Sequence, residues 1–171
     1  MTIAEKAGSV VSFDLVSNSA WNISGIENWA TVSDEAGIND KTITLTAMAN
    51  PLTQRRSQTL KVFSPGAASE TITITQLEAL PMLSISPESL IVNAGEGSTA
   101  SLMIISNTSW TLKCSEPWLL PGEAKGDRFG RVVFTASENN GSTERKAKIT
   151  LSANGLTPKI ISVIQKPAET K

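Results

Sequence analysis

The sequence predicts an all-β protein made of two tandem β-sandwich domains. The first observation is an internal repeat, because the pair Trp21 and Trp29 recurs as Trp110 and Trp118 at an offset of 110 − 21 = 89 positions. The second is the alternation of apolar and polar residues in short, β-branched runs, which is typical of half-buried strands. The third is that no segment keeps a helical period beyond a turn or two.

The repeat holds without a gap across most of the chain. Residues that recur unchanged at the same offset include Asn18 and Asn107, Ala47 and Ala136, Asn50 and Asn139, Arg56 and Arg145, Gly66 and Gly155, and Gln76 and Gln165. A register kept over this length indicates two copies of one folding unit rather than a chance resemblance.

Each copy contains the same series of strand-like runs. Their inward-facing residues in the first copy are Val11, Phe13 and Leu15, then Trp21 and Ile23, Ile43 and Leu45, Leu60 and Val62, and Ile72 and Ile74. Their counterparts are Ala100, Leu102 and Ile104, Trp110 and Leu112, Val132 and Phe134, Ile149 and Leu151, and Ile161 and Val163. Turn residues separate the later runs, and Asn154-Gly155 suits a hairpin because both positions can take positive φ. About six or seven short strands per copy predict an immunoglobulin-like β-sandwich.

We predict domains at 1–78 and 82–168. The junction LEALPM is short and contains Pro81, so we expect it to hold the domains end to end with limited freedom. The second copy opens with LSISPES (83–89), which has no counterpart in the first copy. We therefore expect the first domain to lack its first strand, and the chain to begin inside a domain, as a trimmed or processed form would.

Composition argues against several classes of function. The chain has no histidine, a single cysteine (Cys114) and a net charge of −1. The commonest general base and the usual zinc ligand are therefore missing, and the scattered cations give no footprint for nucleic acid. No apolar run approaches the roughly 18 residues that span a bilayer, and the N-terminus does not resemble a signal peptide. We expect no enzyme, cofactor or metal, and we interpret Cys114 as a small buried hydrophobe.

The four tryptophans form two pairs with different expected roles. Trp21 and Trp110 alternate with polar neighbours, so we expect them in the core, where burial of about 150–250 Å² contributes about 4–6 kcal/mol before entropy losses. Trp29 and Trp118 each follow a turn, where they could plug the end of the sandwich or lie at its rim. The plug is the favoured interpretation. These two are nevertheless the candidate ligand-binding residues, because a rim tryptophan with an open face can stack on a sugar.

We expect the other repeated polar residues to be structural. They are Asn50 and Asn139, Arg56 and Arg145, and Gln76 and Gln165. The asparagines should bond the local backbone at a turn, the arginines should be edge charges or ion-pair partners, and the glutamines should be structural amides. The loop SDEAGINDK (33–41) gathers oxygen ligands of the kind calcium prefers. Its counterpart GEAKGDR (122–128) adds cations, so we interpret both as polar loops with glycine turns.

The order of these motifs resembles a known family. The first copy runs SAW, NWATVS, a strand ending in Ala-x-x-Asn, an arginine with an alternating strand, and TITITQ, and the second runs TSW, PWLLPG, TASEN, RKAKITL and SVIQ. This order resembles tandem BACON domains (Bacteroidetes-associated carbohydrate-binding, often N-terminal). The missing first strand and the IQ in place of TQ depart from the pattern. The resemblance implies an immunoglobulin-like sandwich in envelope or secreted proteins of gut bacteria, often beside glycan-degrading enzymes.

Two functions follow as expectations. The first is a non-catalytic accessory module at the cell surface or in a secreted protein, acting as a spacer or adhesion scaffold. The alternative is a carbohydrate-binding module that recognises mucin or polysaccharide glycans through Trp29 or Trp118. Few aromatic residues and no tyrosine argue against an obvious sugar platform. The expected partners are glycans and other domains of a longer polypeptide. Nucleic acid is not expected, nor is a membrane span in this segment.

Overall fold

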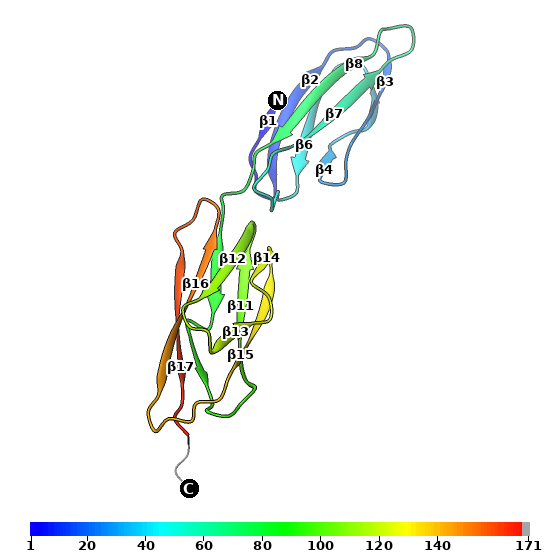
Figure 1. The fold of residues 1–171 in the computed structure, drawn as a ribbon. Helices are drawn as coiled ribbons and strands as arrows, with labels where there is room; N and C mark the ends of the chain where they lie inside the picture. Colours follow the sequence, from blue (N-terminus) through cyan, green and yellow to red (C-terminus); the bar gives the residue numbers. More distant parts are fainter. Residues whose placement is uncertain (169–171) are drawn as a thin grey trace. The chain divides into compact units, whose positions relative to one another are not determined.

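The computed structural model describes residues 1–168, in which every regular element is a β-strand. The chain divides between Leu80 and Pro81 into two compact units, called here unit 1 and unit 2. Each unit contains two sheets (Figure 1), and the two units have the same order of strands apart from one additional strand in unit 2. The predicted all-β fold with two tandem sandwiches is confirmed.

Unit 1 consists of a five-stranded and a three-stranded sheet. The five-stranded sheet has the order β1-β8-β7-β3-β5, and the smaller sheet has the order β2-β6-β4. The strands are β1 (Thr2–Ile3), β2 (Ser9–Leu15), β3 (Ala20–Ser24), β4 (Ala30–Val32), β5 (Ala36–Ile38), β6 (Lys41–Ala47), β7 (Arg56–Phe63) and β8 (Glu70–Gln76).

Unit 2 repeats this plan and adds one strand. Its sheets have the orders β10-β17-β16-β12-β14 and β13-β15-β11-β9. The strands are β9 (Leu83–Ser86), β10 (Ser89–Val92), β11 (Ser98–Ser106), β12 (Ser109–Cys114), β13 (Leu119–Pro121), β14 (Lys125–Asp127), β15 (Gly130–Ala136), β16 (Arg145–Ala153) and β17 (Lys159–Gln165). The additional strand is β9, which pairs with β11 along its outer side. In unit 1 the counterpart of β11 is β2, whose only neighbour within the described sheet is β6.

The core of each unit comes from the predicted alternation. Ile43 and Leu45 in β6, and their counterparts Val132 and Phe134 in β15, are at most 1% exposed, while the residues between them face outward. Successive side chains of a strand point to opposite faces, so one face of each sheet supplies the apolar layer. The two units have separate cores of this kind.

Two parts of the fold differ from the sequence-based interpretation. The segments interpreted as polar loops contain the short strands β5 and β14, which pair with β3 and β12. Their glycines are not turn residues, because a Cβ at Gly37 or Gly126 would run into the indole of Trp21 or Trp110. These glycines are therefore explained by the close approach of a ring to the backbone. Gly155 does occupy the expected turn, with a φ of +74°.

Candidate functional site

Trp21 and Trp110 are core residues, as the alternation predicted. They are 3% and 2% exposed. Each indole also satisfies its polar edge, since Nε1 of Trp21 donates to the carbonyl of Asn39 at 2.9 Å and Nε1 of Trp110 donates to that of Arg128 at 3.0 Å. A tryptophan with a buried ring and a bonded N–H has no free surface for a ligand.

Trp29 and Trp118, the candidate ligand-binding residues, each lie under an arginine. The guanidinium carbon of Arg56 is 4.8 Å from the ring centroid of Trp29, and that of Arg145 is 4.5 Å from that of Trp118. This geometry is a cation–π contact, and it covers one face of each indole. Trp29 is 7% exposed and Trp118 is partly buried. One face of each indole is therefore occupied by a guanidinium in both units.

A buried glutamine holds each arginine in place. Nε of Arg56 donates to Oε1 of Gln76 at 2.7 Å, and its Nη2 donates to the carbonyl of Ala49 at 2.9 Å. In unit 2, Nε of Arg145 donates to Oε1 of Gln165 at 2.6 Å. Both glutamines are 0% exposed, so the prediction of structural amides is confirmed.

The expectation that the arginines are edge charges or ion-pair partners is wrong. Strands β7 and β16, which begin at Arg56 and Arg145, lie inside their sheets. The acceptors are amide and carbonyl oxygens, and burial lowers the pKa of Arg56 while nearby Glu27 opposes that shift. Sequence inspection missed the stacking on tryptophan, although the joint recurrence of Trp and Arg in both copies was the available signal.

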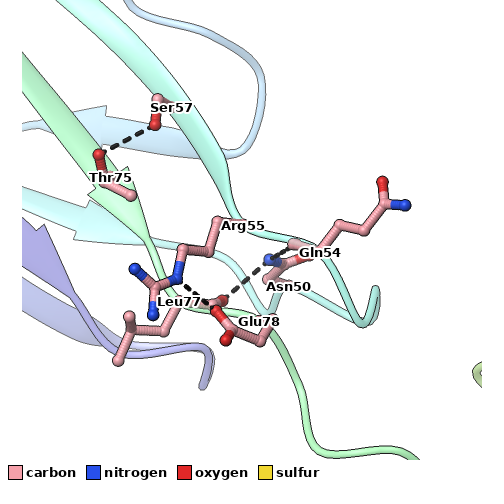
Figure 2. A network of polar contacts seen from close by, with 7 residues as sticks. All are labelled: Asn50, Gln54, Arg55, Ser57, Thr75, Leu77 and Glu78. Atoms are coloured by element: carbon pink, nitrogen blue, oxygen red, sulfur yellow. Dashed lines mark hydrogen bonds and ion pairs between the residues drawn. The ribbon is translucent and has the colours of Figure 1, made fainter.

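In unit 1 the residue before Arg56, which is Arg55, forms an ion pair with Glu78, as Figure 2 shows. Nε of Arg55 is 2.7 Å from Oε2 of Glu78, and this bond holds the pKa of the Glu78 carboxyl below its usual range. Beside it, Nδ2 of Asn50 donates to the carbonyls of Gln54 and Leu77 at 2.8 and 2.9 Å. Asn139 makes the equivalent bonds in unit 2. The prediction that the asparagines bond local backbone is confirmed.

The acidic loop of unit 1 uses its oxygens within the protein. Asp34 pairs with Lys41 at 3.3 Å, and Oδ1 of Asp40 accepts the backbone N–H of Ser17 at 2.8 Å. Within residues 1–168, no group of three or more acidic, histidine or cysteine side chains is placed to hold a metal ion. Cys114 packs partly buried against the core of unit 2, as expected, and burial raises the pKa of its thiol.

One depression lies beside the Trp29 ring. It has a volume of about 550 Å³, is open to solvent, and is lined by Glu27, Asn28, Trp29, Met48, Ala49 and Arg56. Nε1 of Trp29 donates to Oε2 of Glu27 at 2.9 Å, so the polar edge of this ring is also occupied. Along the part of the chain that the structure covers, no helix is both long and apolar enough to cross a bilayer.

Solved structures with a similar fold include enzymes and surface proteins. A GH5 xyloglucanase of Bacteroides ovatus, solved with a heptasaccharide, is 28% identical over 53% of this chain and 20% of its own, with a TM-score of 0.49. The adhesin InvE of Yersinia pseudotuberculosis is 15% identical over 96% of this chain and 56% of its own, with a TM-score of 0.48. The chain thus spans only a fraction of the length of these proteins.

Both units match the same protein-family model. No curated protein matches the chain significantly. The family model BACON, described as "Putative binding domain, N-terminal", matches twice, at residues 19–77 and 108–166. Both matches contain the tryptophan pair, the stacked arginine and the buried glutamine of their unit. The chain belongs to the BACON family and carries two tandem copies of its domain.

Proposed function

We propose that this chain is a non-catalytic accessory module that acts as a tension-bearing spacer and adhesion scaffold in a bacterial envelope or secreted protein. One observation carries the proposal. In each five-stranded sheet, the strand that comes first in the sequence pairs in parallel with the strand that comes last. These pairs are β1 with β8 in unit 1 and β10 with β17 in unit 2. A spacer transmits force through its two ends, and this pairing determines how that force acts on the fold.

The parallel pairing places the hydrogen bonds under shear. The chain enters β10 at Ser89 and leaves β17 at Gln165. These two residues lie at opposite ends of the pair of strands. Tension that passes through β9 to Ser89 therefore pulls β10 and β17 past each other and loads their evenly spaced bonds together. If the strands met the load at the same end, the bonds would break one after another at a lower force. The bond from the N–H of Lys166 to the carbonyl of Val92, at 2.9 Å, closes this ladder.

The non-catalytic part of the proposal rests on how the repeated polar groups are used. Arg145, Gln165 and Asn139 all bond within their own unit, as do their counterparts in unit 1. The chain has no histidine to act as a general base. The envelope or secreted location is supported by membership of the BACON family.

Single-molecule pulling tests the tension-bearing role without changing the fold. In a Cys114→Ala background, handles attached through Ser89→Cys and Lys166→Cys load β10 and β17 in shear. Handles attached through Ser89→Cys and Lys159→Cys load the same strands from one end and peel them apart. All three attachment sites are exposed. We expect a clearly higher unfolding force for the shear pair, and equal forces in the two geometries would refute the proposal.

Glycan binding is the second candidate function, and one observation favours Trp118 for it. Trp118 is more exposed than Trp29, and within the described residues its indole N–H lacks the bond that Trp29 makes to Glu27. A titration of the chain with mucin and plant polysaccharides tests this function. Saturable binding that is lost in Trp118→Ala but kept in Trp29→Ala would support it, provided that circular dichroism shows both variants folded. No binding by the unmodified chain would refute it.

A further inference from the structure

Four exposed lysines lie on the outward face of the five-stranded sheet of unit 2, although the sequence scatters them. They are Lys113 of β12, Lys125 of β14, and Lys146 and Lys148 of β16. Thr111 of β12 pairs with Lys125, and Thr150 of β16 pairs with Lys113, so each lysine is a diagonal or same-strand neighbour of the next. Three steps of about 7–8 Å make a row on the order of 20 Å long, called here the lysine row.

Three isoleucines lie beside the lysine row on the same face. They are Ile91 of β10, and Ile160 and Ile164 of β17. The register places Ile164 between Ile91 and Lys146, and it places Ile160 opposite Thr150. Ile91 is 64% exposed and Ile160 is 56% exposed, whereas Ile164 is partly buried. The face therefore presents apolar surface directly next to its cations.

Unit 1 has small, uncharged residues at all seven of these positions. At the 89-residue offset the lysines correspond to Ser24, Ala36, Ser57 and Thr59, and the isoleucines correspond to Thr2, Thr71 and Thr75. Lys61 is the one cation that faces outward from the described strands of the equivalent sheet, and unit 2 has Thr150 at its position. Both sheets nevertheless have the same order of strands. Folding of the domain therefore does not explain the lysines and isoleucines of unit 2.

Carboxylates beside the lysine row lower its charge without cancelling it. Oε1 of Glu144 is 3.5 Å from Nζ of Lys146, and Asp127 of β14 lies on the same face as Lys125. Over residues 81–168, unit 2 has nine Lys and Arg against seven Asp and Glu, which gives a net charge of 9 − 7 = +2. Over residues 1–80, unit 1 has five against eight, which gives 5 − 8 = −3. The two units thus differ in the sign of their charge, and four of the nine cations of unit 2 share one face.

A hollow of about 500 Å³ borders the same face of unit 2. Its lining residues include Lys146, Lys148, Glu116, Ser162 and Ile164. Ser115 and Ala147 also line it, and unit 1 has the larger Ile26 and Gln58 at these two positions. In unit 1, Gln58 is 3% exposed and Ile26 packs against the core. The smaller residues of unit 2 leave space beside two of the four lysines.

The combination of cations and exposed isoleucines fits a partner that is both anionic and apolar. Single-stranded nucleic acid usually stacks its bases on aromatic side chains, and none of the outward positions in the five described strands of this sheet is aromatic. A hydrated anionic polysaccharide would pair with the lysines but would leave the isoleucines exposed to water. An anionic lipid bilayer uses both features, because its headgroups attract lysines and its interface accepts apolar side chains.

We propose that the outward face of the five-stranded sheet of unit 2 docks on an anionic lipid surface. The lysine row lies on the headgroups, and the three isoleucines lie at the boundary with the acyl chains. Each lysine near such a surface strengthens binding by about fivefold, and salt screens this attraction. The docking goes beyond the tension-bearing role of the chain and does not depend on it.

Sedimentation with lipid vesicles tests the docking on the whole chain. The probe is a vesicle of equal parts phosphatidylcholine and phosphatidylglycerol, and a vesicle of phosphatidylcholine alone is the reference. We expect the chain to sediment with the anionic vesicles at low salt, to be released at high salt, and to stay in solution with the neutral vesicles. No sedimentation with the anionic vesicles at low salt would overturn the proposal.

The residues of unit 1 supply substitutions that separate the two chemistries. Lys146→Ser with Lys148→Thr should weaken binding to the anionic vesicles by about tenfold or more. Ile91→Thr with Ile160→Thr should weaken it by about tenfold, because apolar contact with the interface is lost. The isoleucine variant should still bind dextran sulfate, a soluble polyanion, as well as the unmodified chain does. All four positions are exposed, so circular dichroism should show both variants folded.

A matched control removes two exposed lysines from unit 1. Lys6→Ser with Lys61→Thr changes the net charge as much as the lysine variant of unit 2 does, and should change vesicle binding by less than about twofold. Equal losses in the two lysine variants would show that only net charge matters, and would overturn the site. Unchanged vesicle binding in the isoleucine variant would overturn the lipid surface in favour of a soluble polyanion.

A transfer of the face to unit 1 tests whether these residue types are sufficient. The starting chain carries the unit 1 residues at the lysine and isoleucine positions of unit 2, and therefore should not sediment. Adding Ser57→Lys, Thr59→Lys and Thr71→Ile places the same chemistry on three exposed positions of unit 1. We expect sedimentation with the anionic vesicles to return. Its failure to return in a chain that circular dichroism shows to be folded would overturn the proposal.

Discussion

Replacing Gln165 by Leu should strongly destabilise unit 2, because this buried amide connects four parts of the unit. Its Oε1 accepts Nε of Arg145 at 2.6 Å. Its Nε2 donates to the carbonyls of Asn93 and Ser137, both at 2.9 Å, and to that of Ala94 at 3.3 Å. Leucine is close to glutamine in size, so the change removes the bonds while leaving little cavity.

The magnitude follows from which groups lose their partner. The bond to Arg145 involves a charge and contributes about 1.5–3 kcal/mol. The bonds to Asn93 and Ser137 contribute about 0.5–1.5 kcal/mol each. The carbonyl of Ser137 keeps its bond from Nη2 of Arg145, and that of Ala94 keeps its bond from the N–H of Asn139, which limits the loss. We expect a decrease in the free energy of unfolding of about 3–5 kcal/mol.

Urea denaturation followed by hydrogen exchange assigns the loss to one unit. Peptides from unit 2 should lose protection at lower urea in Gln165→Leu, while peptides from unit 1 should not change. In Gln76→Leu, peptides from unit 1 should lose protection and those from unit 2 should not change, because Gln76 holds Arg56 in the same way. Gln54→Leu, at an exposed glutamine, is the matched control and should shift stability by less than about 0.5 kcal/mol. A loss below about 1 kcal/mol in Gln165→Leu would refute the reasoning.

Three further outcomes follow from the packing. Trp110→Ala and Trp21→Ala should each cost about 3–5 kcal/mol in urea denaturation, and losses below about 1 kcal/mol would show that these rings are not core. Gly126→Ala should cost about 1–3 kcal/mol because the new Cβ meets the Trp110 indole, whereas Gly95→Ala, whose nearest contact is at 3.8 Å, should be near neutral in the same assay. Cys114 should react more slowly with iodoacetamide at pH 8 in the folded chain than in urea, because burial raises the pKa of its thiol and lowers the thiolate fraction. Equal rates in the two states would contradict that reasoning.

The alternation of side chains was sufficient to predict the long strands and the core. Ile43 and Leu45 in β6 illustrate this, since a period of two determines which face each residue occupies. The short strands β5 and β14 were not predictable in the same way. A strand such as Lys125–Asp127 has too few residues to show a period, and its pairing with β12 depends on the Trp110 ring packing over Gly126. Tertiary packing determines whether such short strands form, so the local sequence alone does little to predict them.

The candidate site was only half predictable for a related reason. The turn before Trp29 was visible in the sequence, but the stacking of Arg56 on its ring depends on three strands meeting at one end of the unit. The sequence does not show which strands lie on either side of the strand that begins at Arg56. Without that information, a charged residue at the start of a strand is interpreted as an edge charge. The repeated pair Arg145 and Trp118 then shows that the contact belongs to the domain and is not an accident of one copy.

The two copies share the polar network around their second tryptophan. The Trp–Arg–Gln network is present in both, so it serves folding in each unit. Gln76 and Gln165 each stand in the last residue pair of the parallel ladder of their unit, opposite Ile3 in β1 or Val92 in β10. If the tension-bearing proposal is correct, Gln165→Leu should therefore lower the unfolding force between handles at Ser89 and Lys166 as well as the free energy of unfolding.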